Sequence, residues 1–270
     1  MQQKTKDIQN HFEGFLKTPC LWTESAVYGL KQFQIEQKSI SLNKEIDDTL
    51  RLGKYIERFV SFELSQNEQI EIISENIQIQ KEKITLGELD CILLKEQKAI
   101  HLEVIYKFYL YDASVGTSEI AHFIGPNRKD SLGSKLDKLK NKQLPLLYSK
   151  ECQDYLKTIA LNSDDIEQQI YFKAQLFVPF SEKKIQLKQL NSDCITGFYI
   201  DMEALQQFKD CTFYIPNKKD WLIVPHPNVA WQSMPSFKED CFVIIERNFS
   251  PMCWMKHKNG CIEKFFLVWW

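Results

Sequence analysis

TLGELDCILLKEQKAIHLEVIYKFYL, residues 85–110, is the stretch of the sequence that predicts a β-hairpin. Two apolar-rich runs flank the polar tip 95–98 (KEQK), which is typical of two antiparallel strands joined by a tight turn. A turn centred between residues 96 and 97 places Asp90 directly opposite Glu103. Directly opposite side chains have Cβ atoms roughly 5 Å apart, so two carboxylates in these positions repel each other.

The two faces of this hairpin differ in chemistry, because successive side chains of a strand point to opposite sides. One face is almost wholly apolar: Leu89, Cys91, Leu93, Ile100, Leu102, Val104, Tyr106 and Phe108. The other face carries Glu88, Asp90, His101, Glu103 and Lys107. A divalent cation on the second face would turn the repulsion between Asp90 and Glu103 into shared ligation by hard oxygen donors. The alternative is a solvated outer face on which long side chains avoid one another.

The composition is that of a globular chain with enough residues for one large domain or two modest ones. Of the 270 residues, 44% are hydrophobic and 26% are charged, which argues against disorder. The net charge of −2 counts against tight non-specific binding to nucleic acid, although a local basic groove remains compatible with it. The N-terminal segment is polar and no apolar run approaches the ~20 residues of a membrane helix, so we expect a cytoplasmic protein without membrane contact.

The eight cysteines contain no C-x-x-C pair, and we expect them to be reduced thiols, most of them in the core. One cluster, Cys253-x3-His257-x3-Cys261, is a candidate zinc site. Zinc sites usually have shorter cysteine spacings and need a fourth ligand, which His226 could supply.

Residues 43–65 carry the clearest helical pattern, with apolar side chains from Leu52 to Phe62 at three-to-four spacing. Glu57 falls at the border of this apolar stripe and Glu63 nearer its middle, so the pattern does not single out one acid. By pattern alone, Glu57 is more typical of a surface carboxylate than of a site residue.

The remaining elements alternate between helix and strand before residue 182 and are mostly β after it. Helices are predicted over 1–35 and 134–148, with weaker helical signal at 164–168 and 202–208. Strands are predicted over 70–79, 169–178, 194–201, 211–215, 221–224, 241–246 and 264–269. We divide the chain into an N-terminal helical segment (1–42), a core (43–182) and a mostly β extension (183–270).

A local surplus of basic residues lies between positions 128 and 142, where two aspartates accompany Arg128, Lys129, Lys135, Lys138, Lys140 and Lys142. Such a surplus can contact a phosphate backbone, although a solvated helix face has the same pattern. Pro145 is expected to end or kink this helix.

The predicted elements follow one another as a helix with an acid, a strand, a hairpin with two acids, a basic helix with a glutamine, and a strand. This order resembles the αβββαβ core of the PD-(D/E)xK nuclease superfamily. More closely, several segments resemble a bacterial family of domains of unknown function that is assigned to that superfamily by prediction. These segments are 15–22 (FLKTPCLW), 51–59 (RLGKYIERF), 86–90 (LGELD), 101–110 (HLEVIYKFYL), 125–146 (GPNRKDSLGSKLDKLKNKQLPL) and 196–198 (TGF). The resemblance covers most of the chain and is densest between residues 50 and 148.

The resemblance implies a restriction-endonuclease-like α/β fold: an αβββαβ core with a mixed central sheet flanked by helices, followed by the β-rich extension. It also implies hydrolysis of nucleic-acid phosphodiesters with Mg²⁺ or Mn²⁺ as cofactor. Asp90 and Glu103 would hold the metal, and Glu57 would complete its ligands directly or through water.

The same resemblance gives roles to the neighbouring polar side chains. Lys107 would orient the attacking water or offset negative charge, and Gln143 would fix the water or a phosphate oxygen. The residues that would hold the nucleic-acid backbone are Arg128, Lys129 and Lys135.

The sequence departs from the superfamily rule at one position, because Ile105 stands where Glu-x-Lys requires a lysine. Lys107 lies four residues after Glu103, about 13 Å along an ideal strand, so a bulge and a long side chain would have to bridge the gap. His101 could serve as an extra ligand, although imidazole suits Mg²⁺ poorly. Two functions therefore stay open: a metal-dependent nuclease, or a non-catalytic module that binds nucleic acid or protein on a degenerate nuclease fold.

Overall fold

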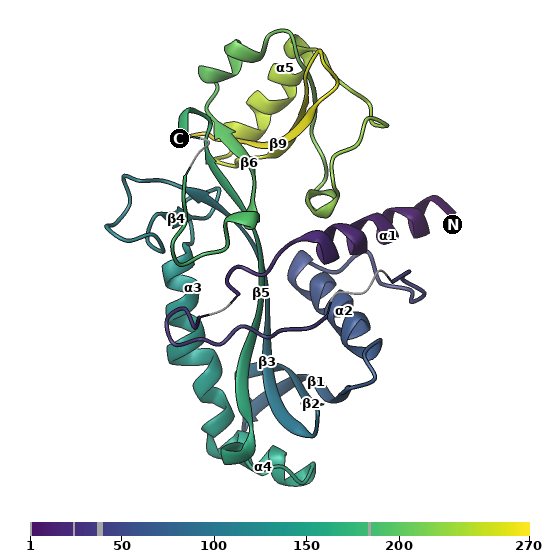
Figure 1. Cartoon of the computed structure of the whole chain (residues 1–270), viewed down its shortest axis with the longest axis vertical. Helices are drawn as coiled ribbons and strands as arrows, with labels where there is room; N and C mark the ends of the chain where they lie inside the picture. The colour runs from purple at the N-terminus through teal and green to yellow at the C-terminus, as the bar shows by residue number, and fades with distance from the viewer. Residues whose placement is uncertain (1, 24, 37–39, 183–184) are drawn as a thin grey trace. The chain divides into compact units, whose positions relative to one another are not determined.

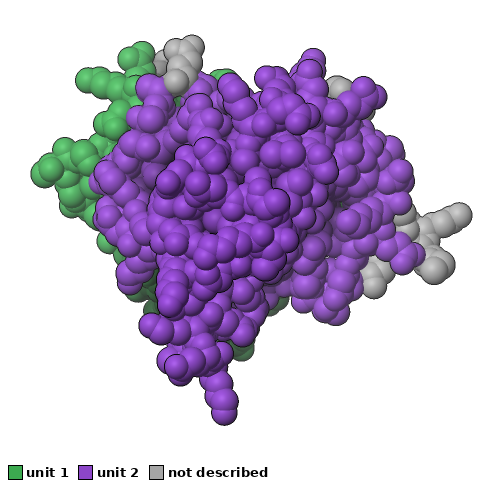
Figure 2. Space-filling view, turned by 90° about the horizontal axis from the view of Figure 1, so that it is seen from below, with its two compact units in different colours: residues 1–19, 107–133, 174–270 green, residues 20–106, 134–173 purple. Residues whose placement is uncertain are grey.

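The computed structural model describes residues 2–23, 25–36, 40–182 and 185–270, and Figure 1 labels its helices and strands. The chain forms two compact units, each made of segments that are distant in the sequence (Figure 2). Unit 1 contains residues 1–19, 107–133 and 174–270, and unit 2 contains residues 20–106 and 134–173. The sequence-based division used three consecutive segments instead, and the first residue of the last segment, 183, lies outside the described residues.

Unit 2 is built on the predicted hairpin. β1 (Ile70–Lys81) pairs antiparallel with β2 (Ile84–Lys95), which pairs antiparallel with β3 (Lys98–Tyr111), and β5 (Glu167–Pro179) is the next strand in the sheet. Cys91 lies opposite Leu102, which confirms the predicted register, and continuing it places Asp90 opposite Glu103. Glu96 and Gln97 both have positive φ, 50° and 67°, as a two-residue hairpin turn requires to match the twist of its strands.

Helices lie on both sides of these strands (Figure 1), so the chain is a mixed α/β protein with a large mixed sheet flanked by helices. α2 (Leu52–Ser65) lies on one side. On the other side α3 (Leu132–Lys138) continues as a π-helical turn, Leu139–Gln143, and a 3₁₀ turn, Leu144–Tyr148. The predicted helix over 134–148 thus becomes irregular near Pro145, whose ring nitrogen cannot donate a helical hydrogen bond.

α4 (Lys150–Thr158), which the sequence did not predict, packs on the sheet of unit 2. Its Leu156 joins Leu147, Leu89 and Ile92 in one buried apolar cluster. The packing covers the hairpin face that was expected to be polar: His101 and Glu103 are both 0% exposed. The solvated alternative is therefore wrong for these two residues, because neighbouring elements exclude water from them.

The N-terminal prediction of a helix over 1–35 is wrong beyond residue 17. α1 (Gln2–Lys17) ends where Thr18-Pro19 follows, since proline has no N–H to donate. In unit 2 the next segment runs beside β5 instead, with Leu21 N–H donating to the Phe172 carbonyl at 2.8 Å and Phe33 N–H to the Ile170 carbonyl at 2.8 Å. The predicted helix over 43–65 begins only at Leu52.

Unit 1 holds the C-terminal part of the sheet. β6 (Ile195–Ile200) pairs parallel with β5 and with β9 (Ile262–Leu267), and β8 (Met252–Lys256) pairs antiparallel with β9 and with β7 (Thr212–Tyr214). A Cβ atom on Gly197 would lie 2.1 Å from the carbonyl oxygen of Lys264, so only glycine lets β6 and β9 approach this closely. The short strand β4 (Phe123–Ile124) pairs with the end of β3.

Two predicted strands of the C-terminal region are wrong. Residues 241–245 belong to α5 (Met234–Ile245), whose C-cap is Glu246; the helix begins after Ser233 and has Pro235 in its first turn. Residues 221–224 overlap a 3₁₀ turn, Asp220–Leu222, and β8 was not predicted. The other short 3₁₀ turns are Ser163–Asp165, Phe180–Glu182, Ser192–Cys194 and Ala204–Phe208. Within the described ranges, no helix has both the length and the hydropathy that a membrane span needs.

Lys264 of β9 is a lysine in the core of unit 1, with 4% of its surface exposed. Its ammonium donates to the Trp221 carbonyl at 2.7 Å and to Gln175 Oε1 at 3.0 Å, both neutral acceptors. Burial lowers the pKa of Lys264 to about 7. In the unfolded chain a lysine titrates near 10.4, so the unfolded state binds more protons between these two values. The free energy of unfolding must therefore rise with pH across that window.

We expect Lys264→Met to remove this rise. Urea unfolding at about pH 7.5 and about pH 9.5 should show wild-type stability increasing by roughly 2 kcal/mol more than that of Lys264→Met. Lys209→Met, at an exposed position of unit 1, should keep the wild-type dependence. Parallel pH profiles for wild type and Lys264→Met would contradict the assignment.

Candidate metal centre

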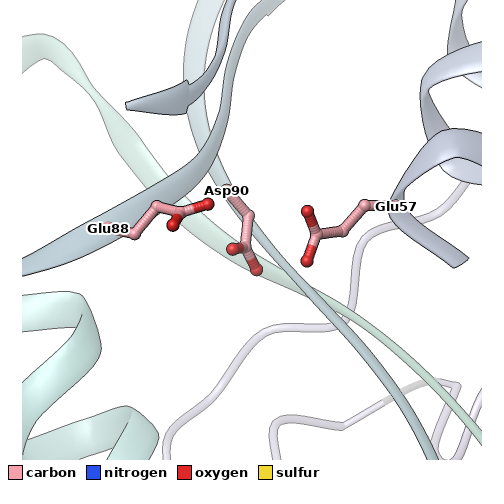
Figure 3. Close-up of side chains that lie close together, drawn as sticks. All are labelled: Glu57, Glu88 and Asp90. Atoms are coloured by element: carbon pink, nitrogen blue, oxygen red, sulfur yellow. The ribbon is translucent and has the colours of Figure 1, made fainter. Parts of the chain in front are cut away.

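Three carboxylates of unit 2 converge at one place: Glu57 from α2, and Glu88 and Asp90 from β2 (Figure 3). One oxygen of each lies within 4.8 Å of the others, and all three residues are half-buried. Glu88 and Asp90 are two residues apart in β2 and so point to the same side of the strand. Carboxylate oxygens are the ligands that Mg²⁺ and Mn²⁺ prefer, so the donor set fits a hard divalent cation.

Lys54 supplies the nearest positive charge. Its ammonium donates to Glu57 Oε2 at 2.8 Å and to Asn76 Oδ1 at 3.1 Å, and it also pairs with Glu88. Burial acts to lower the pKa of Lys54, but the hydrogen bonds to the two glutamates outweigh it and the pKa is raised. One lysine among three acids leaves the cluster with an excess of negative charge.

Two of these acids have raised pKa values. Burial, followed by repulsion from Glu103, raises the pKa of Asp90 to about 7. A hydrogen bond from the Val104 N–H to Asp90 Oδ2, 2.9 Å long, opposes the shift. Burial also raises the pKa of Glu57, against the lowering effect of Lys54. A cation placed between the carboxylates would reverse these shifts, since it favours their ionised forms.

Glu103 is held by protein donors on both of its oxygens. Gln143 Nε2 donates to Glu103 Oε2 at 2.5 Å, and His101 Nε2 lies 3.2 Å from Glu103 Oε1. Lys135 donates to Gln143 Oε1 at 2.9 Å, which orients that amide with its nitrogen toward Glu103. The fully buried carboxylate is thus fixed by His101 of its own strand and by Gln143, which Lys135 orients in turn.

The tautomer of His101 follows from its other neighbour. Gln168 Nε2 donates to the Leu144 carbonyl at 2.8 Å, so this atom is the amide nitrogen, and it lies 3.0 Å from His101 Nδ1. Because an amide nitrogen only donates, Nδ1 must accept, and the imidazole proton lies on Nε2. His101 therefore donates to Glu103 and offers no lone pair toward the cluster.

The structure brings together some of the residues predicted for the site and gives others a different partner. Glu57 and Asp90 share the cluster, and Gln143 contacts Glu103. Lys107 lies in unit 1, where it pairs with Asp130 at 2.7 Å. Ile105, at the expected lysine position, is buried with 5% of its surface exposed.

Sequence reasoning missed two members of the site. Glu88 was placed on the same hairpin face as Asp90 but was not assigned a role, and its two-residue spacing from Asp90 was the available signal. Lys54 precedes Glu57 by three residues, one helical turn, and that spacing was the only sign of it.

The residues predicted to bind nucleic acid are divided between the two units. Arg128 and Lys129 lie in unit 1, where Arg128 pairs with Asp112 and its guanidinium lies 3.8 Å from the ring centre of Trp270. Lys135 lies in unit 2, hydrogen-bonded to Gln143. Lys129 is exposed.

The zinc candidate of residues 253–261 is not assembled. His257 Nε2 lies 2.7 Å from Glu263 Oε2, and its Nδ1 lies 3.6 Å from Cys211 Sγ. Cys253 is fully buried in the core and Cys261 is exposed. Among the residues that the structure describes, only Glu57, Glu88 and Asp90 form a group of three with metal-ligand spacing.

The raised pKa of Asp90 makes a prediction about stability. Between about 3.9, the unfolded value, and about 7, the folded state binds more protons than the unfolded state. The free energy of unfolding therefore falls as the pH rises through this window. Above the window Asp90 is ionised in the folded state, and the free energy of unfolding is lowered by the full amount.

We expect Asp90→Asn to remove that cost. In EDTA, this variant should be more stable than wild type by on the order of 2 kcal/mol near pH 8, and the difference should shrink toward pH 4. Urea unfolding at several pH values measures it, with Glu71→Gln, an exposed acid of β1, as the control. A pH-independent difference would show that Asp90 does not titrate in this way.

The comparisons with known proteins give a family and no activity. A family model described as "Domain of unknown function (DUF1853)" matches residues 19–255, a range that includes every residue of the acid cluster. No curated protein and no solved structure matches the chain.

Proposed function

The chain belongs to the DUF1853 family of domains of unknown function, and from its own residues we propose that it is a Mg²⁺-dependent phosphodiesterase that hydrolyses nucleic acid. The observation that carries the proposal is the convergence of Glu57, Glu88 and Asp90 with too little positive charge around them. Such a cluster costs stability unless a cation binds it, so a site of this kind is a candidate for function.

The order of elements in and around unit 2 supports the nuclease hypothesis. It runs α2, β1, β2, β3, β4, α3, α4 and β5, so apart from the short strand β4 and the added helix α4 it has the αβββαβ order of the PD-(D/E)xK superfamily. In that resemblance the acids come from the first helix and from the second and third strands, and here Glu57, Asp90 and Glu103 come from α2, β2 and β3.

Asp90, Glu57 and Glu88 would hold the metal ion. A bound Mg²⁺ would supply a Lewis acid that lowers the pKa of water and offsets charge on the phosphate in the transition state. Glu103 is assigned a positioning role rather than that of a ligand, because both of its oxygens accept hydrogen bonds from Gln143 and His101. It keeps Gln143 and the β3 backbone in place beside Asp90.

Lys54 takes the role that the superfamily rule gives to a lysine at position 105. Ile105 is buried and apolar, while the ammonium of Lys54 already lies between Glu57 and Glu88. With Mg²⁺ held by the glutamates, the Lys54 ammonium would be available to contact a non-bridging phosphate oxygen or to orient the attacking water. The positive charge thus comes from the helix rather than from the strand.

The alternative is a non-catalytic module that binds nucleic acid or protein on a degenerate nuclease fold. Two observations favour it: Ile105 removes the expected lysine, and Glu103 is saturated with protein donors. The two functions differ in whether a bound nucleic acid is cut.

Cleavage assays decide between them. With Mg²⁺ or Mn²⁺, wild type should cut single- or double-stranded DNA or RNA, and Asp90→Asn, Glu57→Gln and Glu88→Gln should each lower the rate roughly 100-fold or more. Glu71→Gln, which removes an exposed acid, should retain full activity. Cleavage that does not require a metal ion, or wild-type cleavage rates in the three site variants, would reject the nuclease proposal. Binding without cutting would favour the alternative.

The variant Lys54→Met distinguishes the role of the lysine from that of the metal-binding acids. We expect this variant to bind Mn²⁺ as tightly as wild type or more tightly in calorimetry, because it removes a competing cation from the acids. Its cleavage rate should nevertheless fall roughly 100-fold, because the charge that contacts the phosphate is lost. A variant that loses Mn²⁺ binding and activity together would show that Lys54 only supports the structure of the site.

A further inference from the structure

A small pocket of unit 1 is lined by three lysines, Lys107, Lys129 and Lys218. Its volume is about 170 Å³, whereas sites for drug-sized ligands have roughly 300–1,000 Å³. The only acid among its lining residues is Asp130, which pairs with Lys107 at 2.7 Å. With three lysines protonated against one aspartate, the pocket carries a net charge of +2. Its size and charge suit a small anion.

A neutral donor adds to the cations. Asn127 lines the pocket, and its Oδ1 accepts a hydrogen bond from the Ser250 N–H at 2.8 Å. The carbonyl oxygen of the amide is therefore engaged elsewhere, which leaves the Nδ2 group to face a ligand. That group only donates. Apart from Asp130, the polar side chains of the pocket are thus hydrogen-bond donors, which selects a ligand whose oxygens all accept.

Lys218 lies in this pocket without a carboxylate partner among the residues described. Although the residue is exposed, its ammonium lies 3.2 Å from the ring centre of Trp221 and 5.3 Å from that of Phe108. Burial of the ammonium against these rings, together with repulsion from Lys107, lowers the pKa of Lys218 to about 7, and Asp130 only partly opposes this. A bound anion would supply the missing counter-charge.

We propose that this pocket binds a phosphate group, with Lys218, Lys107 and Lys129 as charged donors and the Asn127 amide nitrogen as a neutral donor. A tetrahedral phosphate presents acceptor oxygens in several directions and matches converging lysines. The bound phosphate competes with the Asp130 carboxylate for the Lys107 ammonium and neutralises part of the positive charge of Lys107. All of the residues of this pocket belong to unit 1, whereas the acid cluster belongs to unit 2.

Binding of an anion stabilises the protonated form of Lys218, so binding is coupled to proton uptake near neutral pH. The groups that face its ammonium are Lys107 and Asp130, and Lys129 lines the same pocket. Sulfate is a suitable probe of the coupling because it does not itself titrate in this range.

The test is calorimetric titration of the full chain with sodium phosphate and with sodium sulfate, in EDTA so that the acid cluster has no metal. Wild type should bind both anions, and the affinity for sulfate should fall about tenfold between about pH 6 and about pH 8 as Lys218 loses its proton. Lys218→Met should weaken phosphate binding about tenfold or more and remove the pH dependence. Lys218→Arg should retain binding, and so should Lys209→Met, at an exposed lysine of unit 1 outside the pocket.

Two further arms identify the source of the phosphate and separate this site from the proposed nuclease. A 5′-phosphorylated oligonucleotide that competes with sulfate, when its 5′-hydroxyl counterpart does not, supports a nucleic-acid end as the ligand. Competition by inorganic phosphate alone supports a free anion. Asp90→Asn should leave anion binding unchanged whether or not the chain is a nuclease. The proposal is overturned if wild type binds neither anion at millimolar concentration, or if Lys218→Met, folded as judged by its unfolding transition, binds phosphate as wild type does.

Discussion

Repulsion between carboxylates withdrawn from water is the constraint on which the candidate centre depends. The hairpin places Asp90 opposite Glu103, and α2 adds Glu57 beside Glu88. The fold relieves this repulsion in three ways. Lys54 pairs with the two outer glutamates, His101 and Gln143 donate to Glu103, and the raised pKa of Asp90 allows it to carry a proton. A cation bound among Glu57, Glu88 and Asp90 would replace the proton on Asp90 and relieve the remaining repulsion.

The donors to Glu103 are held by elements that are distant from it in the sequence. Gln143 reaches Glu103 because the π-helical turn Leu139–Gln143 packs beside β3, and Gln168 fixes His101 from the start of β5. A change in the packing of any of these elements would leave a buried carboxylate without its donor, which costs more than the hydrogen bond itself contributes. The geometry of the acids is therefore set by the packing around the sheet as much as by the strands that carry them.

The two units concentrate charge of opposite sign. Unit 2 holds half-buried acids suited to a hard cation, and unit 1 holds a lysine-lined pocket suited to a phosphate. The net charge of −2 conceals both features, because it sums over a chain whose acidic and basic side chains are sorted locally. Total charge thus gives no sign of either feature, whereas the surroundings of single residues such as Asp90 and Lys218 are informative.

Secondary structure was predictable where neighbouring residues determine it. The prediction failed where an apolar run was assigned without knowledge of the residues that pack around it. Residues 241–246 (CFVIIE) have the composition of a buried strand, yet in α5 Phe242 and Val243 are more than half exposed, at 57% and 51%. Composition cannot show which residues meet the core, and short apolar runs fit a helix and a strand equally well. The predicted helix beyond Lys17 failed for a related reason, because the N–H groups of Leu21 and Phe33 donate to carbonyls of β5 and not to a preceding helical turn.

The sequence by itself determined the hairpin, its register and the facing acids, because a two-residue turn and a period of two are properties of neighbouring residues. Only the tertiary structure decided which other side chains join them. Lys54 of α2 pairs with Glu88 of β2, Lys107 pairs with Asp130, and Glu103 accepts a hydrogen bond from Gln143 of the π-helical turn. Such contacts join positions far apart in the chain, and they depend on how helices pack on a sheet, which no short stretch of sequence specifies.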